Sequence, residues 1–93
     1  MSVEVLYFAD LKEITHKKSE KIRLEQFSIT ELKDILFQKY SGLKKHLWSS
    51  EKNGFKPSIS IVINDKRLRE NDILSHKLDK GDKIAFLLPI SGG

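Results

Sequence analysis

The sequence predicts an α+β domain, in which one main helix packs across a mixed sheet of about five strands. Three observations lead to this expectation. Runs of β-branched, aliphatic and aromatic residues stand near both ends of the chain, at 3–8 and 83–88. Only residues 28–40 show the apolar spacing of a long amphipathic helix. The chain has 93 residues, which suits one domain with a small core of its own.

The first part of the chain predicts two strands with a short helix between them. Residues 3–8 carry apolar side chains on both faces of the pleat, as in a central strand. Residues 10–14 fit one or two helical turns, with Asp10 as the N-cap. The alternation that follows directs Ile22 and Leu24 inward, so this segment is expected to form a hairpin with the first strand.

The main helix has recognisable signals at both ends. Ser28 and Glu31 have the spacing of a capping box, which satisfies free amides at a helix start. Gly42 stands where a left-handed C-terminal cap is expected. Between them the apolar stripe consists of Ile29, Leu32, Ile35, Leu36 and Tyr40. We interpret the stripe as core, because a small sheet needs such a helix to cover one face.

The middle of the chain is less regular. Residues 44–57 predict a long loop or a helical extension that ends in a turn. Within this segment Trp48 either packs on the core or anchors a partner, and we favour packing. Residues 58–63 form a strongly β-prone run, which the turn formers Asn64 and Asp65 stop.

The last part of the chain predicts a short strand, an irregular connection and a closing strand. The connection, within 67–78, is expected to be anchored by Ile73, Leu74 and Leu78. Residues 79–82 read as a turn in which the aspartates act as caps. The first and last strands are both strongly apolar, so we expect them to pair in parallel at the centre of the sheet. This arrangement is the β-grasp, or ubiquitin-like, fold.

Composition excludes several classes of function. There is no cysteine, so disulfides, thiolate metal sites and cysteine nucleophiles are excluded. His16, His46 and His76 lack metal-ligand spacing, and we expect no bound metal. The net charge of +4 comes from 17 basic and 13 acidic residues that are mixed along the chain, which does not favour nucleic-acid binding. No long apolar run is present, so we expect no membrane association and a cytoplasmic protein.

After the last strand the chain continues through Pro89, Ile90 and Ser91 and closes on two residues without side chains, Gly92 and Gly93. We predict a globular domain at 1–88 and a flexible tail at 89–93. Glycine adds no bulk, so such a tail can thread a narrow channel and deliver a terminal carboxylate to chemistry elsewhere. The alternative interpretation is a frayed chain end. Nothing else in the chain has the pattern of an active site.

Three segments of the chain resemble the MoaD family, the small sulfur-carrier subunit of molybdopterin synthase. They are residues 8–13, 78–83 and 88–93, and the likeness extends over nearly the whole chain in the order of its elements. The family commonly has glutamate where this chain has Lys83, and proline where it has Leu88. Partner contacts at these two positions are therefore expected to differ in detail.

This resemblance implies a specific function for the tail. A MoeB-like enzyme would use ATP to adenylate the carboxylate of Gly93, and sulfur would then displace AMP to give a thiocarboxylate. A MoaE-like large subunit, in a heterotetramer, would receive the tail and pass the sulfur to cyclic pyranopterin monophosphate. The chain would not be catalytic alone, and no tightly bound cofactor or metal is expected.

A carrier with a threaded tail also needs a separate docking surface. Leu6, Phe8 and Leu87 are apolar on the sheet face away from the main helix, and we predict that they dock partners, as residues in these positions do in the family. The alternative is that residues 44–57 cover them. Other functions also remain open: a ThiS-like or ubiquitin-related-modifier sulfur carrier, or a ubiquitin-like binding module without tail chemistry.

Overall fold

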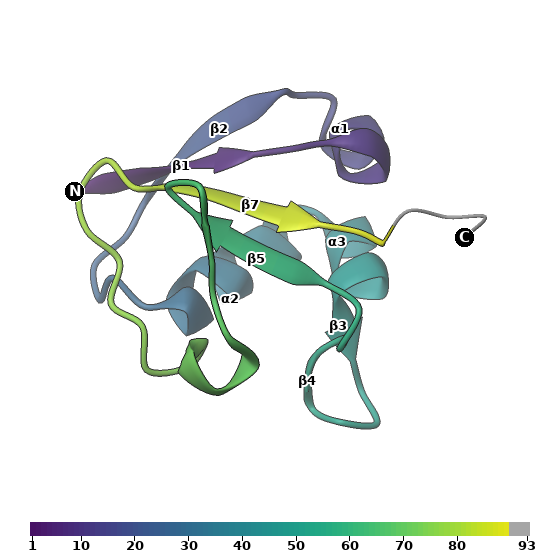
Figure 1. The fold of residues 1–93 in the computed structure, drawn as a ribbon. Helices are drawn as coiled ribbons and strands as arrows, with labels where there is room; N and C mark the ends of the chain where they lie inside the picture. Colours follow the sequence, from purple (N-terminus) through teal and green to yellow (C-terminus); the bar gives the residue numbers. More distant parts are fainter. Residues whose placement is uncertain (90–93) are drawn as a thin grey trace.

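The computed structural model describes residues 1–89, which contain a five-stranded mixed sheet, a two-stranded hairpin and three α-helices (Figure 1). The strands of the main sheet are β1 (Ser2–Leu6), β2 (Ser19–Arg23), β5 (Ser60–Ile63), β6 (Lys66–Arg67) and β7 (Lys83–Leu87). The hairpin consists of β3 (Trp48–Ser49) and β4 (Gly54–Phe55). The helices are α1 (Ala9–Thr15), α2 (Ile29–Lys39) and α3 (Ser41–Leu47), followed later in the chain by a 3₁₀ turn at Glu70–Asp72.

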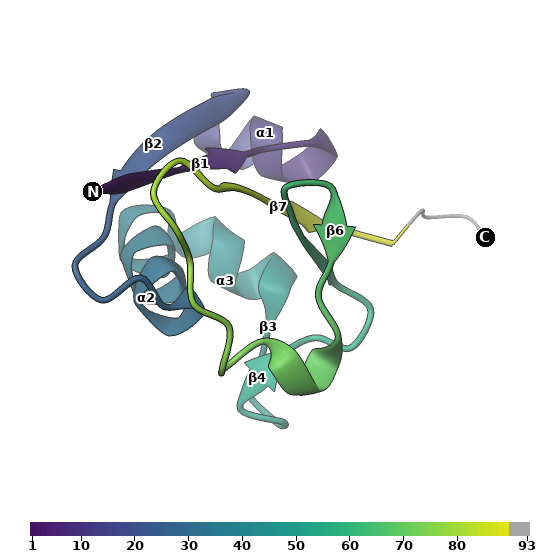
Figure 2. The same cartoon turned by 60° about the vertical axis from the view of Figure 1, so that its left-hand side comes forward.

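The strands of the main sheet are arranged in the order β2-β1-β7-β5-β6. β1 and β7 pair in parallel at the centre, while β2, β5 and β6 pair with their neighbours in antiparallel fashion. Figure 2 shows β6 at the edge, beyond β5 and β7. The predicted β-grasp topology, with the first and last strands at the centre, is therefore confirmed.

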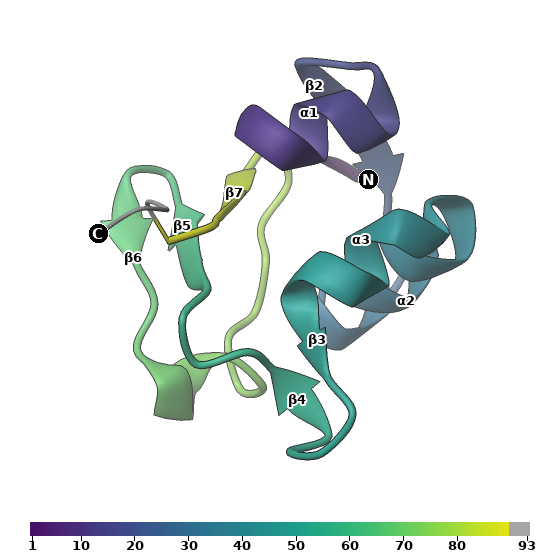
Figure 3. The ribbon, with the colours of Figure 1, turned by 90° about the vertical axis from the view of Figure 1, so that its right-hand side faces the viewer.

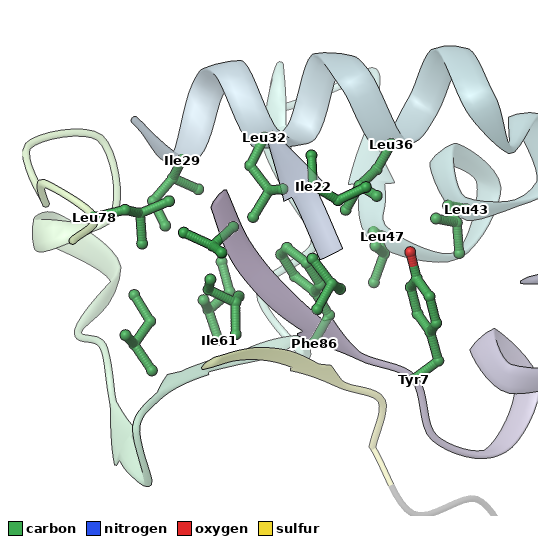
Figure 4. Close-up of a cluster of buried hydrophobic side chains, with 14 of the residues drawn as sticks. Tyr7, Ile22, Ile29, Leu32, Leu36, Leu43, Leu47, Ile61, Leu78 and Phe86 are labelled. Atoms are coloured by element: carbon green, nitrogen blue, oxygen red, sulfur yellow. The ribbon is translucent and has the colours of Figure 1, made fainter. Parts of the chain in front are cut away.

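The core lies between the sheet and the pair of helices α2 and α3, which lie together on one side of it (Figure 3). Alternate residues of the strands face this side, and Val5, Ile61 and Phe86 are almost completely buried. Leu32 and Leu36 of α2 meet them from the helix layer (Figure 4). The predicted stripe is thus core, because its burial removes apolar surface from water.

The start of α1 differs from the prediction. Phe8 occupies the N-cap position with extended backbone and provides no side-chain hydrogen bond. Asp10 instead lies inside the first turn, where a carboxylate interacts favourably with the positive end of the helix dipole. Asp10 is therefore not the N-cap. The helix ends at Thr15, and the C-cap residue His16 has a φ of 61°, in the left-handed region.

At the start of α2, one of the two hydrogen bonds of the predicted capping box is formed. The Ser28 Oγ accepts a hydrogen bond from the Glu31 N–H at 3.0 Å, as predicted. The Glu31 carboxylate turns to the preceding loop instead of Ser28, and it accepts N–H bonds from Glu25, Gln26 and Phe27 at 2.7, 2.7 and 3.1 Å. One glutamate therefore organises the whole entry into the main helix.

Gly42 is not the C-terminal cap of the main helix. α2 ends at Lys39, Tyr40 is extended with a φ of −134°, and Gly42 lies within the next helix, α3. A Cβ atom at Gly42 would lie 3.2 Å from the Cγ2 of Ile14 in α1. The glycine is thus explained by the close approach of two helices, not by a left-handed turn.

The segment 44–57 contains most of α3 and the β3–β4 hairpin, which matches the predicted helical extension and turn. Trp48 packs edge-to-face against Phe37 and Phe55, with ring centroids 5.9 and 5.4 Å apart. Phe55 in turn stacks on Phe86 of the core at 5.8 Å. The packing interpretation of Trp48 is therefore confirmed, because these aromatic contacts fix the hairpin to the core.

The connection between β6 and β7 has fewer anchors than predicted. Leu78 is buried, and Ile73 packs partly against the core. Leu74, however, is 78% exposed, so its prediction as an anchor is wrong. The 3₁₀ turn before Leu74 has only three residues, which is too short to direct successive apolar side chains to the core. Of the adjacent pair Ile73 and Leu74, only Ile73 packs against the core.

Candidate functional site

The sheet face away from α2 and α3, here called the outer face, carries a cross-strand row of apolar side chains. Leu6 is the register partner of Ala85, and Ala85 is the register partner of Val62 on the far side. Register partners share one face, so these three side chains are neighbours. Phe8 and Leu87 follow two residues beyond Leu6 and Ala85, and they remain 50% and 37% exposed.

These side chains surround a groove of about 510 Å³, here called the Phe8 groove. Its lining consists of Leu6, Phe8, Val62, Asn64, Asp65, Lys83, Ala85 and Leu87. The structure thus brings together all three residues that the sequence suggested for docking. None of residues 44–57 lines the groove, because their hairpin packs on the opposite side of the sheet through Phe55 and Phe86.

A second hollow of about 390 Å³ adjoins the Phe8 groove. It is lined by Leu6, Tyr7, Phe8, Ala9, Lys12, Lys18 and Ser19. Leu6 and Phe8 belong to both linings, so the phenyl ring stands on a ridge between two depressions. Such a ridge offers a partner one protruding ring and two recesses, a shape suited to interdigitating contact.

Backbone hydrogen bonds on both sides of Phe8 fix the chain at this position. The Tyr7 N–H donates to the Lys18 carbonyl at 2.8 Å, and the Phe8 carbonyl accepts from the Leu11 N–H at 3.0 Å. Ala9 has a φ of 50°, in the left-handed region that residues with a Cβ rarely adopt. This sharp reversal leads from β1 into α1 and leaves the Phe8 side chain on the outer face.

A buried carboxylate, Glu20 of β2, supports the same strand from the core side. It accepts hydrogen bonds from the hydroxyls of Tyr7 and Tyr40, each at 2.9 Å, and forms ion pairs with Lys17, at 3.0 Å, and with Lys39. We call this cluster the Glu20 network. It ties β2 to β1 and to the end of α2. Sequence reasoning missed it, although an inward-facing tyrosine signals a need for a polar partner.

Electrostatics keep Glu20 ionised. Burial raises the pKa of its carboxyl, but hydrogen bonds from Lys39, Lys17 and the two tyrosines outweigh burial and lower it from 4.5 to about 2. Burial and the neighbouring Glu20 carboxylate raise the pKa of Tyr7 well above its usual range. Tyr7 therefore remains a hydrogen-bond donor to Glu20 at every pH at which the domain would function.

The opposite end of the Phe8 groove is fixed by a tight turn. Asn64 and Asp65 have φ values of 50° and 71°, a pair of left-handed residues suited to a two-residue hairpin. The Asp82 carboxylate accepts from the Asn64 side-chain amide and from the Asp79 N–H, both at 2.7 Å. The Asn64 side-chain oxygen accepts from the Lys83 N–H at 3.0 Å. The predicted turn-capping role of these aspartates is thus observed for Asp82.

The predicted tail begins close to the groove. β7 ends at Leu87, a groove residue, and Pro89 is exposed two residues later. Because β1 and β7 are parallel, their C-terminal ends lie at the same end of the sheet, so the exit from β7 is on the side where Phe8 follows β1. Ile90, Ser91, Gly92 and Gly93 lie outside the described residues, so the predictions made for them stay predictions.

Within residues 1–89, no group of His, Asp and Glu side chains has the arrangement of a metal site. His16 ends α1, and the His46 ring lies 3.1 Å from the Gly42 carbonyl within α3. No helix in this part of the chain combines the length and the hydropathy that crossing a bilayer requires. The Phe8 groove, with the chain exit beside it, is thus the leading candidate site among the described residues.

Comparison with solved structures places the fold in a known class. The small archaeal modifier protein 1 from Methanosarcina acetivorans is 27% identical, with a TM-score of 0.80, over 99% of this chain and 96% of that one. Subunit 1 or 2 of the molybdopterin-converting factor complex from Helicobacter pylori is 30% identical, with a TM-score of 0.67, over 100% of both chains. One chain of the Amycolatopsis orientalis BexX/CysO complex is 24% identical, with a TM-score of 0.77, over 98% of this chain and 99% of that one. This likeness supports the fold alone.

The chain is therefore a ubiquitin-like domain of the sulfur-carrier type. The model of the ThiS family matches residues 5–93, and the chain belongs to this family. Two of the similar structures were determined as complexes, that of the two molybdopterin-converting factor subunits and that of BexX with CysO. Similar domains thus form complexes with partner proteins.

Proposed function

We propose that this protein is the sulfur-carrier subunit of a molybdopterin synthase, with the carboxyl group of Gly93 as its reactive group. The observation that carries the proposal is the Phe8 groove: an exposed apolar site beside the exit of β7, in a member of the ThiS family. Support for the molybdopterin branch comes from the 30% identity to a chain of the molybdopterin-converting factor complex.

The chemistry begins with activation, because a carboxylate is a poor electrophile. An adenylating enzyme joins the Gly93 carboxylate to AMP and releases pyrophosphate from ATP. Sulfide then attacks the acyl carbon and expels AMP, and loss of its proton leaves a thiocarboxylate. Glycine suits this step, since the adenylating pocket has to admit the bare backbone.

The thiocarboxylate next acts as the sulfur donor. The tail enters the large subunit, where the sulfur is transferred to cyclic pyranopterin monophosphate, and two such transfers build the dithiolene of molybdopterin. Throughout these steps the domain binds its partners through Leu6, Phe8 and Leu87. Docking offsets the entropy that the tail loses when it is threaded.

A second candidate function is protein modification, which the 27% identity to a small archaeal modifier protein favours. Both functions would share the adenylate of Gly93. The two functions differ at the next step. In protein modification, a lysine amine of a target protein attacks the adenylate in place of sulfur, AMP leaves, and an isopeptide bond forms.

The test is intact-mass analysis after incubation with an adenylating enzyme, ATP and a sulfur donor. We expect the mass gain of one oxygen-to-sulfur exchange, followed by its loss when the large subunit and cyclic pyranopterin monophosphate are added. A chain that lacks Gly93 is the control and should gain nothing. Equal gain in that control, or no gain in the full chain, would contradict the carrier function. Sulfur loading without transfer to the pterin would assign another branch of the family.

A further inference from the structure

We propose that the Phe8 groove selects a partner protein with an acidic docking surface, and that Lys12, Lys18 and Lys83 determine this specificity. The inference rests on the proposed function, in which the domain docks on an enzyme while its tail reacts. It adds the chemical character of that enzyme's surface. We call these three residues the lysine rim.

The lysine rim flanks the apolar ridge on two sides. Lys83 lines the Phe8 groove, while Lys12 and Lys18 line the adjoining hollow. Leu6 and Phe8 are common to both linings, so the three lysines line two adjoining hollows that share an apolar boundary. All three lysines are exposed, and within residues 1–89 none is in an ion pair.

Few carboxylates on this face oppose the lysine rim. Asp65 is the carboxylate that lines the Phe8 groove, and the adjoining hollow has none in its lining. Glu4 is the register partner of Lys83 on one side and of Lys21 on the other. The cross-strand row of Lys21, Glu4 and Lys83 therefore carries a net positive charge. The outer face therefore presents an apolar centre within an excess of positive charge.

This pattern identifies the occupant as a protein surface with an apolar side chain among aspartates or glutamates. A second copy of this chain does not fit, because an isologous dimer through this face would bring two lysine rims together. A nucleic acid fits less well. Phe8 is the aromatic ring of the groove, and Val62, Ala85 and Leu87 offer bases no flat surface for stacking.

Exposed charges around an apolar contact act mainly on encounter. They attract the partner over a Debye length and orient it before the apolar groups meet. Removing the lysine rim should therefore slow association and weaken its dependence on salt, while dissociation from the apolar centre changes little.

The experiment measures association by stopped flow with the adenylating enzyme encoded in the same genome, at low and at high NaCl concentration. The test variant changes all three rim lysines to glutamine. The control variant loses the same charge on the helix side and in the β3–β4 loop, through Lys44→Gln, Lys45→Gln and Lys52→Gln. We expect association of the rim variant to be about tenfold slower at low salt, and the control to bind like the parent chain.

The result has three informative outcomes besides the expected one. A parent chain that gains sulfur but binds the enzyme equally well without the lysine rim overturns this inference alone. A parent chain that never gains sulfur overturns the proposed function and the inference with it. Binding of a labelled single-stranded oligonucleotide, weakened by loss of the rim but not in the control, would assign the face to nucleic acid and also overturn the inference.

Discussion

Replacement of Glu20 by glutamine should destabilise the domain by about 2 kcal/mol at neutral pH. The depression of the Glu20 pKa from 4.5 to about 2 corresponds to about 3 kcal/mol of interaction favouring the ionised form. The two lysine side chains that pair with it are each 46% exposed, so solvent screening reduces this value. The amide retains an oxygen that can accept from Tyr7 or Tyr40, but it removes the charge.

The pH dependence of this effect follows from the direction of the pKa change. Because the folded-state pKa of Glu20 is depressed, its contribution is complete above pH 4.5 and is lost as the pH falls toward 2. Urea unfolding across this pH range should show a difference in the free energy of unfolding between the parent chain and Glu20→Gln, and this difference should disappear on acidification. Glu51→Gln, at an exposed carboxylate without an ion pair in residues 1–89, serves as the control. A gap of constant size, or none at pH 7, would refute the role assigned to the Glu20 network.

Two further substitutions test the docking surface and the helix packing. Phe8→Asp should weaken binding to the adenylating enzyme at least tenfold in titration calorimetry, because it puts a charge on the apolar ridge, and leave the fold intact by circular dichroism. Leu74→Asp, at an even more exposed apolar residue outside the groove, should bind normally; unfolding of the Phe8 variant or unchanged affinity would contradict the docking role. Gly42→Val should lower the free energy of unfolding by about 1–3 kcal/mol, since its branched side chain would crowd Ile14, and stability equal to that of the parent would disprove this close packing.

Patterns that repeat along the chain were sufficient to predict the framework. The alternation that buries Ile22 and the helical spacing of Leu32 and Leu36 each rest on several residues with one period. Such patterns reflect the burial of a whole face, so a single irregular residue does not disturb them. The apolar character of both faces of β1 likewise predicted its central place and the exposure of Phe8.

Features set by one residue were harder to predict. Gly42 has the sequence signature of a cap, but its role is set by Ile14, which comes from another helix. Asp10 is a good N-cap residue, yet α1 begins at Ala9 and its N-cap is Phe8. The Glu20 network joins groups as far apart in sequence as Tyr7 and Tyr40. A single sequence does not record such tertiary contacts, and local propensity cannot replace them.

The parallel pairing of β1 with β7 has a mechanical consequence. When a partner holds the residues beyond Pro89, any pull on them is transmitted directly to β7. This strand pairs with β1 over residues 83–85 and with β5 over residues 84–87. The load therefore acts in shear on both ladders together, and neither can open one bond at a time from its end. A pull on the chain beyond β7 would therefore be resisted by both neighbouring strands before the sheet opens.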